Sequence, residues 1–209
     1  MPTPLAHGVA AWATAKSADP GDLRGPRLFA LVAFLAVVPD LDFLPGFLLD
    51  YPDAFHRGPT HSVVGAALAS AAIAWVLALL SARRGRDARG FGGWLGLVMP
   101  MYYAHILLDL LVPDHNGATG MRLFWPFSDA FIGTPMPMPA GLRAFIDLGI
   151  GTESGSFVGA LLSWHGLAVF VVEGLLFTPL LLAPKLMGSA RRRVSGLSMG
   201  PAAREQPEA

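Results

Sequence analysis

Residues 63–82 read VVGAALASAAIAWVLALLSA, a run of twenty residues without a single charged side chain. At a rise of ~1.5 Å per residue, a helix of this length covers about 30 Å, the thickness of the hydrocarbon core of a bilayer. The rest of the chain fits a bilayer, because 53% of its 209 residues are hydrophobic, only 14% are charged, and the mean hydropathy is +0.50. We therefore expect an all-α, polytopic membrane protein.

Further apolar segments extend this prediction. Residues 91–112 and 157–183 predict two more spanning helices. Residues 4–15 and 28–38 predict two shorter helices joined by a polar turn, with Pro39 ending the second. The expected fold has three long transmembrane helices plus a short N-terminal helical hairpin. Together they form a single membrane-embedded domain over residues 1–190, followed by a basic and then disordered C-terminal tail over residues 191–209.

The basic residues predict the orientation in the membrane. They cluster in the turn of the N-terminal hairpin, in the loop after the first long span and after the last span: Lys16, Arg24, Arg27, Arg83, Arg84, Arg86, Arg89, Lys185, Arg191, Arg192 and Arg193. An even number of expected crossings separates these segments, so all can lie on one face, which the positive-inside rule assigns to the cytoplasm. No cationic residue precedes Lys16, so we expect no cleaved signal peptide.

Potential metal ligands gather on the opposite face of this predicted topology. There are seven: His7, Asp40, Asp42, His56, His61, His105 and Asp109. Ionisable side chains next to apolar spans need compensation, and a divalent ion compensates carboxylates and imidazoles together. The chain has no cysteine, so a metal would be held by His and carboxylate alone. This ligand set suits Zn²⁺, with Mn²⁺ or Fe²⁺ as alternatives, and one or two ions.

Residue spacing supports this site in two places. His105 and Asp109 are four residues apart and therefore share one face of a helix. Asp40 and Asp42 follow the second short helix, where one carboxylate can bind the metal while the other orients a ligand from behind. A carboxylate that stays free, Asp42 or Asp109, is the candidate general base.

The stretch His56-Arg57-Gly58-Pro59-Thr60-His61-Ser62 is the most informative part of the site. Two imidazoles flank a Gly-Pro turn, and Thr60 or Ser62 can cap the helix that starts near Val63. Arg57 carries a planar group of donors suited to a phosphate or carboxylate oxygen. We expect Arg57 to contact an anionic substrate, because a guanidinium does not ligate a cation.

The order and spacing of these motifs, together with Leu123-Phe124-Trp125-Pro126-Phe127-Ser128, resemble the YdjM-like family of LexA-binding, inner-membrane-associated hydrolases. The resemblance covers roughly residues 5–130, and HRGPTHS is its most specific part. It implies a multi-pass, metal-dependent hydrolase of the bacterial inner membrane. The positions that match the family pattern are His7, Asp40, His56, Arg57, Thr60, His61, His105 and Asp109.

The sequence thus predicts a membrane-bound hydrolase in which a metal activates water against an ester or phosphoester of an amphipathic or lipid-like anionic substrate. The expected partners are the bilayer and this substrate, and the zero net charge gives no general attraction to nucleic acid. Two other classes stay open. A metal or proton transporter would need polar residues along its spans, where only His165 and Glu173 offer them. A non-catalytic membrane adaptor would need only a structural metal.

Overall fold

The computed structural model describes residues 4–18, 23–49, 56–84, 89–111, 120–133, 163–182 and 184–185. In these residues the fold is helical, as predicted. Met121 and Ile132 also form an isolated antiparallel β-bridge. The elements run in the order α1 (Pro4–Ala18), α2 (Gly25–Val37), η1 (Val38–Asp42), α3 (Phe43–Leu48), η3 (Pro59–His61), α4 (Val63–Arg84), α5 (Phe91–Leu111), α8 (Trp164–Phe177) and η4 (Thr178–Leu182). The predicted disordered tail lies outside the described residues.

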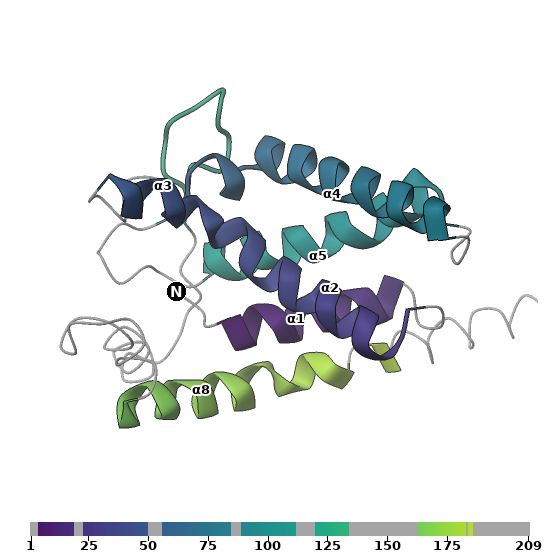
Figure 1. The fold of residues 1–209 in the computed structure, drawn as a ribbon. Coiled ribbons are helices and arrows are strands. Elements are labelled where there is room, and N and C mark those ends of the chain that lie inside the picture. Colours follow the sequence, from purple (N-terminus) through teal and green to yellow (C-terminus); the bar gives the residue numbers. More distant parts are fainter. Residues whose placement is uncertain are drawn as a thin grey trace, which may run out of the picture.

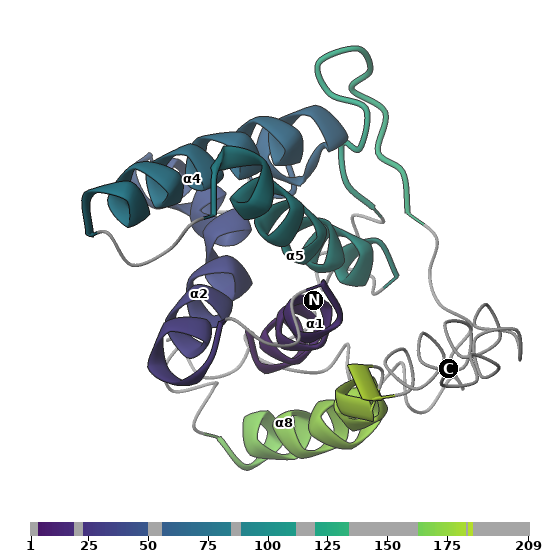
Figure 2. The same cartoon turned by 90° about the vertical axis from the view of Figure 1, so that its right-hand side faces the viewer.

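The helices lie roughly along one direction, with α4 on one side, α5 and α1 in the middle and α8 on the far side (Figures 1 and 2). The predicted N-terminal hairpin is present, since α1 packs against α2 and both contact α5. Most buried positions of α1 are alanines, namely Ala6, Ala10, Ala11, Ala13 and Ala15. Small side chains let helices approach closely, which explains how α1 fits between its neighbours.

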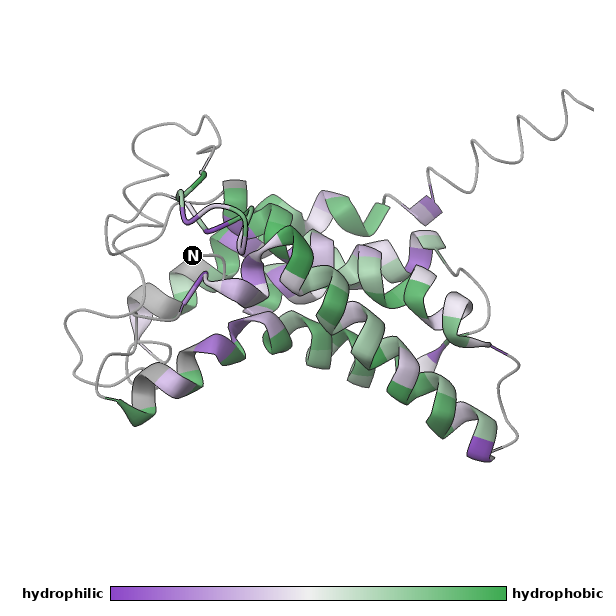
Figure 3. Cartoon of the chain, turned by 90° about the horizontal axis from the view of Figure 1, so that it is seen from above, coloured by the Kyte–Doolittle hydropathy of each residue, from purple (hydrophilic) through white to green (hydrophobic). Residues whose placement is uncertain are grey.

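Two helices among the described residues are long and apolar enough to cross a membrane, judged by length and composition: Val63–Arg83 in α4 and Phe91–Leu110 in α5. Only 17% of the α4 span is buried in the protein, against 44% of the α5 span. Of these two helices, α4 is therefore the less covered by the rest of the protein. Hydrophobic residues run along the middle of the helices and hydrophilic residues lie mainly toward their ends (Figure 3).

The prediction of a third long span over residues 157–183 is wrong for the part that the structure describes. There the chain forms α8, which is 14 residues long, followed by the 3-10 helix η4. The α-helix ends at Phe177, directly before Thr178 and Pro179. Proline has no backbone N–H to donate and its ring crowds the preceding turn, so the chain tightens at this point.

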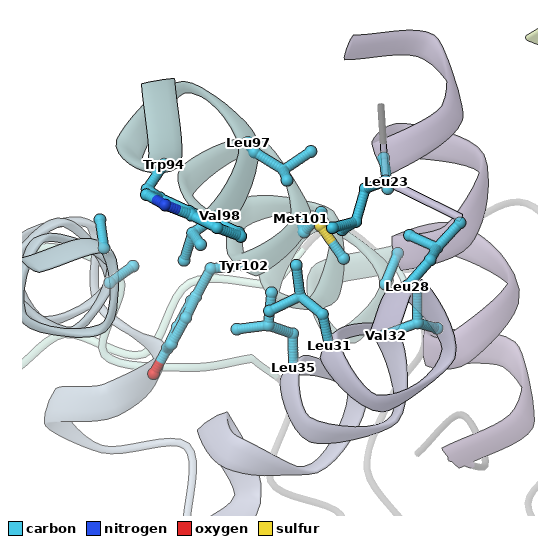
Figure 4. Packing of buried hydrophobic residues seen from close by; sticks show 14 of the residues in the cluster. Leu23, Leu28, Leu31, Val32, Leu35, Trp94, Leu97, Val98, Met101 and Tyr102 are labelled. Atoms are coloured by element: carbon cyan, nitrogen blue, oxygen red, sulfur yellow. The ribbon is translucent and has the colours of Figure 1, made fainter. Parts of the chain in front are cut away.

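The core lies where α2 crosses α5. Figure 4 shows Leu28, Leu31 and Leu35 of α2 facing Met101 and Tyr102 of α5. Leu35, Met101 and Tyr102 have no measurable exposure to solvent. This packing fixes the end of α2, and with it the start of η1, against the C-terminal half of α5.

The first turn of α4 is also fixed closely. Ser62 is its N-cap, because the Ser62 hydroxyl oxygen accepts a hydrogen bond from the backbone N–H of Gly65 at 2.9 Å and donates to the carbonyl of Pro59 at 2.7 Å. A Cβ added at Gly65 would overlap the backbone carbonyl of Pro59. Glycine at position 65 therefore lets the turn of residues 59–61 rest on α4.

We predict that Gly65→Ala lowers the free energy of unfolding by about 1–3 kcal/mol, the usual cost of overpacking. Gly96→Ala is the matched control, since an added Cβ at Gly96 meets nothing within 4 Å. It should change stability by less than ~1 kcal/mol. The measurement is the thermal unfolding midpoint of both variants in detergent, and equal midpoints would contradict the proposed contact.

Candidate metal centre

Four separate parts of the chain meet at one end of the helix bundle (Figure 1). They are the first turns of α1 with His7, the 3-10 helix η1 with Asp40 and Asp42, residues 56–61 with His56, Arg57 and His61, and the end of α5 with His105 and Asp109. The structure thus brings all seven predicted ligands and Arg57 into one region. His7, Arg57, His61, His105 and Asp109 are each exposed by 2% or less.

Local sequence explains how each segment turns toward this region. After Val37 the chain tightens from α2 into η1, in which Pro39 cannot donate the next helical hydrogen bond. At Arg57 the backbone has a φ of 57°, a left-handed conformation that is uncommon for a residue with a side chain. Such strained positions are held by their surroundings and cluster at functional sites. Here the conformation reverses the chain immediately before the turn of residues 59–61.

Asp40, His61, His105 and Asp109 form the centre of the cluster. Each offers one ligand atom, and these four atoms all lie within 4.8 Å of one another. The Nε2 atom of His61 is 3.3 Å from Oδ1 of Asp40 and 3.2 Å from Oδ2 of Asp109. The Nε2 atom of His105 is 3.3 Å and 3.5 Å from the same two oxygens. We refer to these four residues as the central group.

The central group has the properties of a metal site. The Nε2 atoms of both imidazoles, Oδ1 of Asp40 and both carboxylate oxygens of Asp109 are buried and have no partner that meets hydrogen-bond geometry. Buried ionisable groups without satisfied hydrogen bonds are costly unless a charge or an ion compensates them. In a tetrahedral site with bonds of ~2.1 Å, ligand atoms lie about 3.4 Å apart. The four N–O separations of 3.2–3.5 Å are close to this value, and the other pairs of ligand atoms lie within 4.8 Å, so the group could hold a divalent ion.

Asp42 lies behind His61, outside the central group. Its Oδ2 is 3.0 Å from Nδ1 of His61 and accepts a hydrogen bond from the Thr60 hydroxyl at 2.7 Å. Its Oδ1 is 3.1 Å from Nδ1 of His56. With Nδ1 of His61 facing a carboxylate, Nε2 is left to face Asp40 and Asp109. Carboxylates in this position commonly orient a metal-binding imidazole. Asp42 and His56 were predicted as ligands, and the structure places both outside the central group.

Neighbouring polar side chains keep the carboxylates of Asp40 and Asp42 in η1 ionised. Burial alone would raise the pKa of Asp42, but contacts with His56, His61 and Thr60 hold it well below its usual value. Burial likewise opposes ionisation of Asp40, yet His105 and His61 lower its pKa to about 2. A carboxyl with such a low pKa is a weak proton acceptor near neutral pH. Asp42 therefore suits orientation better than the predicted role of general base.

His7 and Arg57 lie on the other side of Asp109. The ring of His7 stacks on that of His105 with centroids 3.7 Å apart, and its Nε2 is 3.4 Å from Oδ1 of Asp109. The Nη2 atom of Arg57 is 3.6 Å from the same oxygen. Asp109 thus offers Oδ2 to the central group and Oδ1 to His7 and Arg57. His7 was also predicted as a ligand and lies next to, rather than within, the central group.

The sequence analysis did not identify two tyrosines of α5 that support the site. Tyr102 donates a hydrogen bond from its hydroxyl to the carbonyl of Thr60 at 3.2 Å, and Tyr103 donates to the carbonyl of Val63 at 2.7 Å. Tyr102 lies three residues before His105, so it shares a helix face with the site, and this spacing was the available signal. Glu173, whose role the sequence left open, is buried on α8.

A helical bundle with two membrane-length helices and a buried His/Asp group at one end defines a helical membrane protein with a candidate metal centre. The family model described as YdjM inner membrane protein matches residues 1–191, so the chain belongs to this family. Its two long apolar helices fit the inner-membrane location that the family's description gives. Neither the search of curated proteins nor the search of solved structures found a match.

We predict that Asp40→Ala and His105→Ala each lower bound metal strongly while the protein still inserts into the membrane. Each change removes one atom of the central group, whereas insertion depends on the apolar helices. Asp129→Ala is the control, because the Asp129 side chain is 83% exposed and lies outside the group. The measurement is the metal content of the purified proteins. Wild-type metal content in both variants would show that Asp40 and His105 are not ligands.

We expect Asp42→Asn to behave differently. Removing a group that orients a ligand commonly weakens metal affinity by about 10–100-fold without removing the site. The variant should therefore still bind metal at the wild-type ratio when the metal is in excess. Titration with a competing chelator measures this affinity. Unchanged affinity would show that Asp42 does not orient His61, and loss of binding at saturating metal would make Asp42 a ligand.

Proposed function

We propose that this protein is a membrane-bound, metal-dependent hydrolase that acts on an ester or phosphoester of an amphipathic, anionic substrate. The observation that carries the proposal is the central group, in which two buried imidazoles and two carboxylates face one another without satisfied hydrogen bonds. A bound divalent ion supplies a water of lowered pKa, near ~7, and polarises the oxygen of an ester or phosphoryl group. Zn²⁺ suits the ligands, with Mn²⁺ and Fe²⁺ as alternatives.

The surrounding residues have distinct roles in this proposal. Asp42 fixes the ring of His61 through Nδ1. Asp109, the other carboxylate predicted as a general base, offers Oδ1 to His7 and Arg57 and thereby holds both side chains beside the central group. Arg57 binds a negatively charged oxygen of the substrate beside Asp109. The near-complete burial of these side chains excludes bulk water and strengthens every charge interaction among them.

A structural metal in a membrane adaptor is the second candidate, and the number of ligands favours it. Four protein ligands close a tetrahedral zinc site, as in structural zinc centres, whereas catalytic sites keep a position for water. Hydrolysis at this group therefore needs an ion with five or six ligands, or release of one carboxylate. The ion pair between the buried Arg57 and Asp109 is compatible with either candidate, because it stabilises a structural site and, in a hydrolase, holds a guanidinium beside the group for an anionic substrate.

A transporter has less support from the two long helices. Within residues 63–82 of α4 and 91–104 of α5 there is no Asp, Glu, His, Lys or Arg that could carry an ion across the bilayer. Apart from Glu173, which is buried on α8, the buried ionisable groups belong to the site at the end of the bundle. This distribution suits a reaction at one membrane face rather than transfer through the membrane.

The proposed orientation follows from α4. The helix starts at Val63 beside the site and ends at Arg84, with Arg83 before it and Arg89 shortly after. Twenty-two helical residues rise about 33 Å, so the site and this basic segment lie at opposite ends of a membrane-length helix. The positive-inside rule then places the basic segment in the cytoplasm and the site at the outer face of the inner membrane.

Arg57 gives the test of the enzymatic proposal. We expect Arg57→Gly to keep the metal content near wild type but to lower turnover by about 10²–10³, the usual effect of losing one charge-stabilising donor. Glycine is the informative replacement because it accepts the left-handed backbone at this position without strain. Arg57→Lys should restore only part of the rate, since an ammonium cannot reproduce the planar pair of donors.

The assay combines metal analysis with hydrolysis of a panel of phosphomonoesters, phosphodiesters and carboxylic esters by protein loaded with Zn²⁺, Mn²⁺ or Fe²⁺. Wild-type turnover in Arg57→Gly would exclude Arg57 from catalysis. A fully loaded wild-type protein that hydrolyses none of the panel would favour the adaptor.

A further inference from the structure

A short loop projects from the bundle beside the candidate metal centre. Residues 120–133, which we call the aromatic loop, are closed at their base by two hydrogen bonds of 2.9 Å between the backbones of Met121 and Ile132. Gly120 allows this closure with a φ of +107°, and a Cβ there would overlap the carbonyl of Ile132. The loop is therefore a defined hairpin-like structure.

The aromatic loop is joined directly to the site. The carbonyl of Leu123 accepts a hydrogen bond from the backbone N–H of Val63, the first residue of α4, at 2.9 Å. The backbone N–H of Arg122 donates to the carbonyl of Arg57 at 3.2 Å. These bonds hold the base of the loop against both the start of a membrane-length helix and the residue proposed to bind substrate.

The outer part of the aromatic loop presents large apolar side chains. Phe124 and Phe131 are each 50% exposed and Phe127 is 85% exposed. Polar groups accompany them: the guanidinium of Arg122 lies 5.3 Å from the ring centre of Phe131 and 3.7 Å from a carboxylate oxygen of Asp129. Exposed Phe rings beside an Arg side chain suit a segment that lies at the boundary between lipid and water, where apolar rings enter the acyl chains and the cation stays at the headgroups.

The position of the aromatic loop also indicates that it meets the membrane. Figures 1 and 2 show the loop extending past α4 on the side away from α1 and α8, across the direction of the α4 axis. Because that axis is expected to cross the membrane, the loop extends in the plane of the membrane at the level of one end of the span. The outer face of α4 continues this surface with Val63, Leu68 and Trp75, all partly exposed. The α3 region adds exposed Leu44 and Leu48 at the same end of the bundle.

We propose that the aromatic loop inserts Phe124, Phe127 and Phe131 into the lipid–water boundary of the bilayer, next to the candidate metal centre. The rings lie among the upper parts of the acyl chains, and Arg122 and Asp129 stay at the level of the headgroups. The loop thereby sets the depth of the site in the membrane. This inference depends only on the membrane location and is independent of whether the site is catalytic.

Depth-dependent fluorescence tests the proposal. The chain has no cysteine, so a single introduced cysteine carries a polarity-sensitive label at one place only. We choose Phe127→Cys, with Asp129→Cys as a matched control of equal exposure in the same loop and Trp75→Cys in the middle of α4 as the hydrocarbon reference. The labelled proteins are placed in vesicles of phosphatidylethanolamine and phosphatidylglycerol.

The label at position 127 should emit at shorter wavelength than the label at 129. It should be quenched by lipids with a nitroxide near the headgroup end of the acyl chain, and the label at 75 by lipids with a deeper nitroxide. Aqueous iodide should quench 129 most strongly. The circular dichroism spectrum and thermal unfolding midpoint of each labelled protein check that the fold is retained. Phe131→Cys provides a second, independent reporter for the case that Phe127→Cys fails to fold.

Two outcomes overturn the proposal. If iodide quenches the labels at positions 127 and 131 as strongly as the label at position 129, and nitroxide lipids do not quench them, the loop lies in water. Emission at short wavelength without quenching by either agent would mean that protein covers the loop, either another segment of this chain or a second copy.

Discussion

Two carboxylates and two imidazoles that are withdrawn from water must be compensated where they meet, and the rest of the structure is arranged around this requirement. Their facing atoms are 3.2–3.5 Å apart and lack hydrogen-bond partners. Desolvation of charges costs several kcal/mol each, and His61 and His105 offset part of this cost, since they lower the pKa of Asp40 to about 2. A bound divalent ion would join the same side chains into one link between η1, η3 and α5.

The apolar core supports this link from behind. Leu35 at the end of α2 and Tyr102 on α5 are both fully buried, and Tyr102 also donates a hydrogen bond to the backbone of Thr60. The core packing of α2 on α5 and the position of the 56–62 turn are therefore coupled through one side chain. This coupling explains why a helix pair that resembles an ordinary membrane bundle can hold ligands with the precision that a metal site needs.

The site and the lipid boundary are connected by short backbone contacts. Arg57 receives a hydrogen bond on its carbonyl from Arg122, and the aromatic loop also binds the first residue of α4. Membership of an inner-membrane family agrees with the apolar face of α4. These contacts join the residue that we propose to bind substrate to the loop that we propose to meet lipid.

The sequence by itself determined the helical fold, the two long apolar helices and the region that contains the candidate ligands. Uncharged runs of membrane length and the spacing of His105 and Asp109 are local properties, which need no knowledge of distant contacts. The tertiary structure decided how far α8 extends and how the ligands are divided. The apolar run of residues 157–183 suggested a long span, yet the α-helix ends before Pro179. Asp40 and Asp42 look equivalent in the sequence. They differ because the turn of η1 directs Asp40 toward His105 and Asp42 toward Nδ1 of His61, a choice made by the packing of η1 against residues 56–61 and α5.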